Sequence, residues 1–341
     1  MEGRRIAGVG SYCVGGGGNC QGSNEEVGDR RTLNQSPVTD ADRRLARLQD
    51  HDLAKIERLG IAAAARIGFH ARQAAIKAWR NHHNPGKAAA KKLHDAVPLI
   101  TDCMAAGHLA GMRRSRLLVP KKKLSLATYR IGSFGVDPDE QSPFFGSIRF
   151  LADRLEMEDD DYERLQNAYH PEALKVVKTA SDMVERQIEE KLQEAISSGQ
   201  HIKGGIAALQ EAFDDAGIEP RNSFTLEAIF RTQTALAYGA GRWRADQDPD
   251  IQERLWGYRY VTMEDDRVRP EHVGFDGVTL PKNDMFWMEA WPPNGWGCRC
   301  CAISIFEKRS LFHPRAVEVD GKIVEPSVAK GFRFNPGVLF G

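Results

Sequence analysis

The sequence of 341 residues has no apolar run that approaches the roughly 20 residues that a membrane-spanning helix needs. Its first 22 residues also lack the compact apolar stretch of a secretory signal, which predicts a soluble protein without an export signal. Its six cysteines are too few and too unevenly spread for a disulfide framework, which favours a reducing compartment. With 41% hydrophobic and 28% charged residues, the composition is typical of a mostly folded protein.

The net charge is zero, but the charges are unevenly distributed. Residues 1–123 hold 22 Lys and Arg against 11 Asp and Glu, and residues 124–341 carry the compensating net charge of −11. This asymmetry indicates an N-terminal third that contacts an anionic partner, DNA or an acidic protein surface, although a solvated helix face explains it equally well. The densest basic group is the predicted contact with double-stranded DNA: Arg113, Arg114, Arg116, Lys121, Lys122 and Lys123. No aromatic side chains interleave it, which favours a basic loop between domains.

Changes in composition divide the chain into four segments. Residues 1–38 are rich in Gly, Ser and Asn and show no periodicity, which predicts a disordered tail. Apolar residues at helical spacing predict a basic helical region over residues 39–123, and Gly and Pro predict an irregular linker over residues 124–150. Three further helical stripes with short connections predict an antiparallel bundle within a domain of residues 151–341.

The chain after these helices carries the residue types that form sites. Alternating aromatic residues from Trp256 to Met263 predict a strand that leads into acidic residues 264–266. A carboxylate cluster at a strand end can be catalytic, but Arg267 and Arg269 stand beside it, and intramolecular ion pairing explains the same residues. The predicted fold class is α+β: a helical N-terminal region and a three-helix bundle followed by a small β-containing Cys/His subdomain.

Within this subdomain, His272 and a Cys-X-Cys motif have the residue types of a metal site. If residues 300–305 form a strand, Cys298 and Cys300 project to one face and Cys301 to the other. Two thiolates on one face and His272 supply three of the four ligands that tetrahedral zinc prefers. The motif is less diagnostic than paired Cys-X-X-Cys units, and buried cysteines that pack as small hydrophobic side chains are the alternative.

The fourth ligand of such a site would be a carboxylate, Asp276, or a second histidine, His313. In the alternative without metal, His272 is hydrogen-bonded to an Asp. A nucleophilic cysteine beside His272 is also conceivable, but it needs an acidified, exposed thiol and an orienting group. The sequence alone establishes neither.

A specific combination of residues extends over the C-terminal half: Arg231, Thr232, Asp266, Arg267, Arg269, His272, Asn294, Gly295, Cys298, Arg299 and Cys300. In order and spacing it resembles the phage Mu F-like family of minor head proteins, and the resemblance covers about half of the chain, residues 165–340.

The resemblance implies a minor capsid or head morphogenesis protein of a tailed phage or prophage. Such a protein associates with the portal protein, other head proteins and packaged DNA, and lies in the virion head after assembly in the bacterial host cytoplasm. The resemblance implies no catalysis, no small-molecule substrate and no membrane contact, so that a bound zinc would be structural. The alternative is a metal-dependent hydrolase or nuclease that uses His272, Cys298 and Cys300.

Overall fold

The computed structural model describes residues 37–119, 159–199, 202–218 and 222–340, with six single positions between residues 144 and 157. Nearly all of the predicted tail, most of the predicted linker and Lys121, Lys122 and Lys123 lie outside the described residues. Residues 36–341 form one compact unit. In its described part, no helix is both long and apolar enough to span a bilayer.

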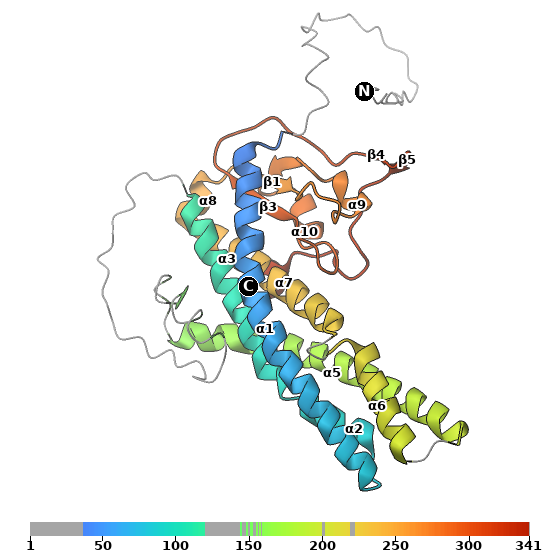
Figure 1. Ribbon diagram of the computed structural model, residues 1–341. Helices are drawn as coiled ribbons and strands as arrows, with labels where there is room; N and C mark the ends of the chain where they lie inside the picture. The colour runs from blue at the N-terminus through green and yellow to red at the C-terminus, as the bar shows by residue number, and fades with distance from the viewer. Residues whose placement is uncertain are drawn as a thin grey trace, which may run out of the picture. The chain divides into compact units, whose positions relative to one another are not determined.

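Helices form most of this unit (Figure 1). They are α1 (Asp40–Arg80), α2 (Pro85–Leu93), α3 (Ala96–Leu118), α5 (Asp159–Ser197), α6 (Ile202–Ala216), α7 (Phe224–Asp246), α8 (Pro249–Arg254), α9 (Pro270–Val273), α10 (Phe286–Glu289) and α11 (Pro336–Phe340). The long helix predicted to begin near residue 40 is α1, and Thr39 starts it with a capping box to Asp42. α2 and α3 continue the helical region predicted over residues 39–123. Pro98 lies in the first turn of α3, where its missing N–H has no helical partner to lose.

α3 and α7 lie at the centre of the helical part, and glycines let their backbones approach closely. A Cβ added at Gly241 of α7 would lie 1.9 Å from the carbonyl oxygen of His108, and one at Gly111 of α3 would lie 2.1 Å from that of Tyr238. α1 packs on both helices, α5 packs on α2, α3 and α6, and α6 also packs on α1. One apolar core therefore joins the N-terminal helices to α5, α6 and α7.

Two small antiparallel sheets follow the helices. Their strands are β1 (Gly257–Val261), β2 (Thr279–Pro281) and β3 (Cys301–Ile305), in the order β2-β1-β3, and β4 (Val317–Val319) paired with β5 (Lys322–Val324). The strand predicted from alternating aromatic residues is β1. The fold is therefore α+β, with a small β-containing Cys/His subdomain, as the sequence predicts.

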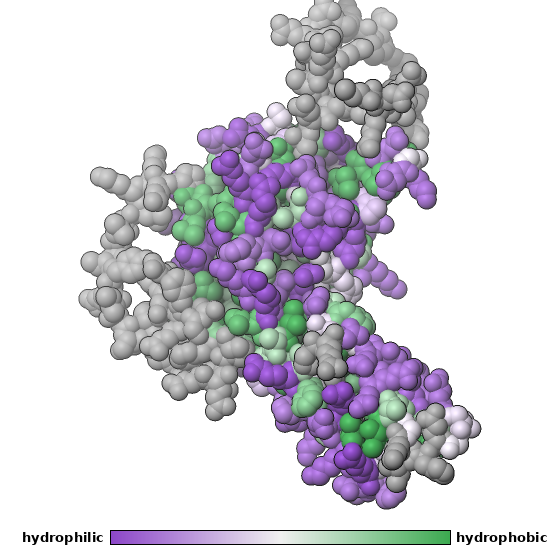
Figure 2. Space-filling model, in the orientation of Figure 1, coloured by the Kyte–Doolittle hydropathy of each residue, from purple (hydrophilic) through white to green (hydrophobic). Residues whose placement is uncertain are grey.

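The three-stranded sheet lies between an aromatic core and α1. Tyr258 of β1 packs edge to face on Trp287 and Trp291. Residues that point to the opposite side of the sheet, such as Val261 and Cys301, pack with Ala46 of α1. On the surface, hydrophilic residues cover most of the face shown in Figure 2.

Candidate metal centre

His272, Cys298 and Cys300 come together because β1 pairs with β3. Val261 at the end of β1 lies opposite Cys301 at the start of β3 in antiparallel register. The chain that leaves β1 therefore lies beside the chain that enters β3. The first of these segments forms α9, which carries His272, and the second carries both thiols.

The geometry of these three side chains suits one metal ion. Their ligand atoms all lie within 4.8 Å of one another, and all three are buried. His272 Nδ1 lies 3.7 Å from Cys298 Sγ and 3.9 Å from Cys300 Sγ. Tetrahedral zinc, with Zn–S bonds of about 2.3 Å and Zn–N bonds of about 2.0 Å, places such atoms about 3.6 Å apart. A cavity of about 10 Å³, roughly one water-sized sphere, borders the cluster.

The electrostatics of the thiols separates this pair from the other buried cysteines. The hydrogen bond between the two sulfurs lowers the pKa of Cys298 and raises the pKa of Cys300. His272 lowers the pKa of Cys298 further. The hydrogen bond thus favours the thiolate form of Cys298 and the thiol form of Cys300, and metal binding releases thiol protons. Burial raises the pKa of Cys301, and likewise that of Cys103, to about 12. These two thiols therefore stay protonated and pack as small apolar groups.

The loop that presents Cys298 is held by buried polar groups. Asn294 Nδ2 donates to the hydroxyl of Tyr260 at 3.1 Å and to the carbonyl oxygen of Ala290 at 3.1 Å. The N–H of Cys298 donates to the carbonyl oxygen of Gly295 at 3.2 Å. Burial raises the pKa of Tyr260, so its hydroxyl keeps its proton. Asn294 and Gly295, two of the expected signature residues, therefore shape the loop of the Cys-X-Cys motif.

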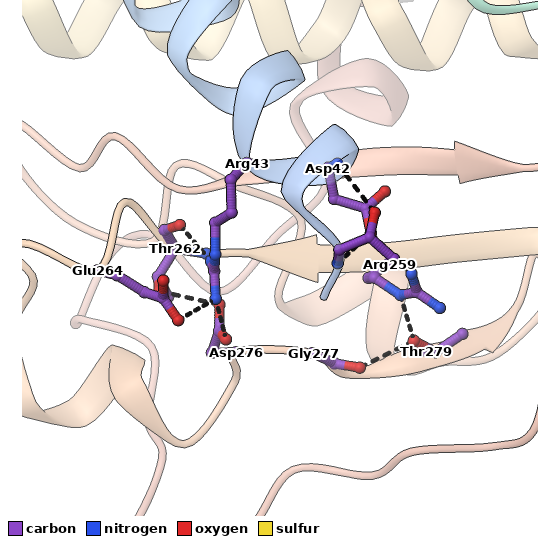
Figure 3. Close-up of polar contacts among 9 residues, drawn as sticks. Asp42, Arg43, Arg259, Thr262, Glu264, Asp276, Gly277 and Thr279 are labelled. Carbon is purple, nitrogen blue, oxygen red and sulfur yellow. Dashed lines mark hydrogen bonds and ion pairs between the residues drawn. The ribbon is translucent and has the colours of Figure 1, made fainter. Parts of the chain in front are cut away.

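Asp276, expected as the fourth ligand, lies instead in a partly buried ion-pair network (Figure 3). Its carboxylate accepts hydrogen bonds from both terminal nitrogens of Arg43, at 2.8 and 2.6 Å, and from the N–H and hydroxyl of Thr262, at 2.8 and 2.9 Å. Burial alone would raise the pKa of Asp276, but these hydrogen bonds outweigh it and hold the pKa below its ordinary value. His313 is exposed, and in the described part of the chain no fourth His, Cys or carboxylate joins the cluster.

The first turn of α1 supplies one cation and one carboxylate of this network, Arg43 and Asp42. Arg43 is 8% exposed and also donates to the carbonyl oxygen of Thr262 at 2.6 Å and to Glu264. The neighbouring Asp42 accepts from Arg259 of β1 at 2.8 Å (Figure 3). We call Asp42, Arg43, Arg259, Glu264 and Asp276 the α1 network. It joins α1 to β1 and to the turn that follows α9.

A second ion-pair group holds the Cys-X-Cys loop. Arg299, between Cys298 and Cys300, donates to both carboxylate oxygens of Asp265 at 2.6 and 2.7 Å, and lies 3.9 Å from Asp50 of α1. Hydrogen bonds from Arg299 lower the pKa of Asp265. The expected partner Arg267 lies 3.6 Å from Asp265, and Arg269 donates to the carbonyl oxygen of Trp296. Ion pairing therefore accounts for Asp265, but its main partner is an arginine 34 residues away.

Three other signature residues lie around this loop without contacting the cluster. Arg231 of α7 pairs with Glu57 of α1 at 3.3 Å. Thr232 accepts a hydrogen bond from the N–H of Gly297 at 3.0 Å, which ties the Cys-X-Cys loop to α7. Asp266 is exposed.

A buried polar group between α3, α7 and β3 has no counterpart among the sequence predictions. Asp246 accepts hydrogen bonds from Ser115 and, at 2.9 Å, from Ser304. Arg242 donates to Ser304 at 3.1 Å and to the carbonyl oxygen of Ala302. Burial raises the pKa of Asp246. In the sequence, the one signal for this buried group was that charged residues occur within an amphipathic helical stripe.

The arginines expected to contact DNA lie at the end of α3. Arg114 pairs with Asp52 of α1 and its side chain is 16% exposed. Arg116 donates to the carbonyl oxygen of Leu155 at 3.3 Å. Arg113 is half-buried. Of these described residues, Arg114 therefore joins α3 to α1, whereas Arg116 is exposed.

Comparison with known proteins identifies the region that carries the cluster. Residues 186–303 match the family described as Phage Mu protein F like protein. This chain contains a Mu F-like region. It extends from α5 to β3, includes His272, Cys298 and Cys300, and confirms the resemblance seen in the sequence. α1 precedes it.

Two relatives have matches of similar extent. One is named "Putative capsid assembly protein F", from Escherichia phage Mu, and is 32% identical over 155 residues, 41% of this chain and 35% of the relative. The other is the Mu-like prophage FluMu F protein of Haemophilus influenzae, 34% identical over 161 residues, 43% of this chain and 37% of the relative. The chain thus matches about a third of the length of these relatives. No solved structure matches it significantly.

Proposed function

We propose that this protein is a minor capsid protein that acts in head morphogenesis of a tailed phage or prophage. The observation that carries the proposal is the Mu F-like match over residues 186–303, which contains the whole His and Cys cluster. The name of the phage Mu relative, a capsid assembly protein, supports the same role. The protein would work inside the phage head, assembled in the cytoplasm of the bacterial host.

In this role the protein associates with the portal protein and other head proteins, and contacts packaged DNA. Helix faces are the expected contact surfaces, because a partner helix can lie in a groove between two helices. One such groove, of about 750 Å³, lies between α1 and the start of α7 and is lined by Arg58, Ile61, Glu227 and Arg231 among others.

Co-expression with the portal protein encoded in the same prophage tests this proposal. The tagged portal protein should retain this chain through purification, and purified heads should contain it. A portal protein from an unrelated phage serves as the control. Repeated failure to co-purify, together with absence of the chain from purified heads, would refute the proposal.

A structural zinc site is the second proposal, and the N···S separations of 3.7 and 3.9 Å support it. Burial of all three ligands beside a cavity of about 10 Å³ leaves no room for a substrate, which favours a structural role over hydrolysis. Purified protein should contain one zinc per chain, and Cys300→Ser should lower both zinc content and melting temperature, since metal binding is coupled to folding. Cys301→Ser is the matched control and should keep the zinc. Well below one equivalent after reconstitution would overturn the site.

A further inference from the structure

A long stretch of the N-terminal helices contains basic residues without any acidic ones. From Arg58 to His94 the chain has eight Lys and Arg, four His and no Asp or Glu. This stretch covers the second half of α1, the turn after it and α2. It precedes the Mu F-like region and includes none of the residues expected to contact DNA.

On α1 the basic residues share one exposed face. At 3.6 residues per turn, six of them fall within an arc of about 120°. We call these six the basic face: Lys55, Arg58, Arg66, His70, Lys77 and Arg80. All six are exposed, and in the described part of the chain none of them pairs with a carboxylate.

The composition of the basic face fits a phosphate backbone better than a protein surface. Protein interfaces have cores enriched in aromatic residues and depleted in Lys. Here Leu59 and Phe69, 42% and 40% exposed, are the large apolar side chains along a face dominated by Lys and Arg. Its 25-residue span is about 38 Å long at a rise of 1.5 Å per residue, comparable to about eleven base pairs at 3.4 Å each.

We propose that the basic face of α1 binds the backbone of double-stranded DNA without sequence preference. The inference rests on the DNA contact proposed above and locates it on α1 instead of the group at residues 113–123. Long, flexible Lys and Arg side chains that no carboxylate neutralises can instead neutralise phosphates and release counterions. Arg114, in contrast, would have to give up its ion pair with Asp52 to do so.

The test uses the full chain, a random-sequence duplex of about 30 base pairs, and binding by fluorescence anisotropy between about 50 and 200 mM salt. The variant Lys55→Gln, Lys77→Gln, Arg80→Gln removes three charges of the basic face outside the groove between α1 and α7, and keeps residues of similar helix propensity. The matched control removes three exposed charges from α5, each 72–74% exposed: Arg164→Gln, Lys175→Gln, Lys178→Gln.

The basic-face variant should lower the slope of log affinity against log salt by about 2.7, which is 0.9 for each lost phosphate contact. The control should bind as the unmodified chain does, and both should keep their melting temperatures. The inference is overturned if the slope is unchanged in the basic-face variant, or if the control loses as much of the slope. It is also overturned if the unmodified chain does not bind the duplex at about 50 mM salt. A basic-face variant that retains DNA binding but loses a salt-sensitive self-association would overturn it as well. If only the DNA inference fails, the basic-face variant and the unmodified chain should both still co-purify with the portal protein. If the head-protein proposal fails, the unmodified chain itself should not co-purify.

Discussion

Replacing Arg43 with Met is the most direct test of how α1 is joined to the Mu F-like region. The substitution keeps the aliphatic part of the side chain and removes the guanidinium that binds Asp276, Glu264 and the carbonyl oxygen of Thr262. The side chains of Arg43 and Asp276 are only 9% and 10% exposed, so solvent cannot replace the lost partner fully.

The expected loss of unfolding free energy is about 3 kcal/mol. Removing one member of a buried ion pair costs about 3–5 kcal/mol, because the remaining charge stays buried without compensation. Thr262 still donates two hydrogen bonds to Asp276, which places the loss at the lower end. Glu264 is 60% exposed and adds at most about 1 kcal/mol. At about 2.1 cal/mol/K per residue over a unit of this size, the melting temperature should fall by about 5 °C.

The difference between the two proteins should depend on pH in a defined direction. Arg43 and Thr262 hold the pKa of Asp276 below its ordinary value in the folded protein. The stability from this carboxylate is therefore fully present above the unfolded pKa of about 3.9 and is lost as the pH falls through the folded pKa. Arg43→Met removes the main reason for the shift, so the gap to the unmodified protein should narrow below about pH 4.

Urea unfolding at about pH 7 and at about pH 3.5 measures both effects. Arg44→Met is the matched control, since Arg44 lies in the same turn and is exposed, and it should change stability by less than about 0.5 kcal/mol. Asp276→Asn in the Arg43→Met background should cost less than the sum of the single changes, because no buried charge is left alone. If Arg43→Met and Arg44→Met have the same stability, the α1 network does not hold the helix.

Two further predictions concern the helical core. Gly241→Ala should destabilise the protein by about 1–3 kcal/mol in thermal unfolding, because the new Cβ would lie 1.9 Å from the carbonyl oxygen of His108; helix propensity alone predicts the opposite sign, a gain of about 1 kcal/mol. Burial lowers the pKa of His108 to about 3 in the folded protein, so the unfolded chain, with a pKa of about 6.5, binds the extra proton and stability falls as the pH drops below that value. His108→Gln should remove up to about 1.4 kcal/mol per pH unit of this decline, and urea midpoints that fall equally in both proteins would contradict the assignment.

The helices and β1 could be predicted because their signals are local. Thr39 caps α1, and Gly199 and Gly217, both with positive φ, lie just after α5 and α6. The break between α2 and α3 could not be predicted, because His94 and Asp95 keep right-handed helical torsions and the apolar spacing continues across them. Hydrophobic periodicity alone does not detect such a break.

In the candidate site, too, the local features could be predicted from the sequence and the contacts between distant residues could not. Strand alternation predicts Cys298 and Cys300 on one face and Cys301 on the other. β3 begins only at Cys301, but the structure does have the first two cysteines on the aromatic side of the sheet and the third on the α1 side. The partner of Asp276 is 233 residues away in Arg43, and only the docking of α1 on the sheet determines that contact. Metal-ligand chemistry suits a free carboxylate, but a carboxylate that faces a buried guanidinium is stabilised as its counterion instead.

Charged residues of the Mu F-like region have their partners outside that region. Arg259 and Asp276 lie within the matched residues, whereas their partners Asp42 and Arg43 lie on α1, before the match begins. Without α1 the matched region would hold charged groups that are partly buried and lack their partners, at a cost of several kcal/mol, and Cys301 would lose the apolar cover of Ala46. In this chain α1 therefore stabilises the turn after His272 through Arg43 and Asp276. The same helix would also present the basic face to DNA, so that α1 would both hold the turn after the proposed metal ligand His272 and carry the proposed DNA contact.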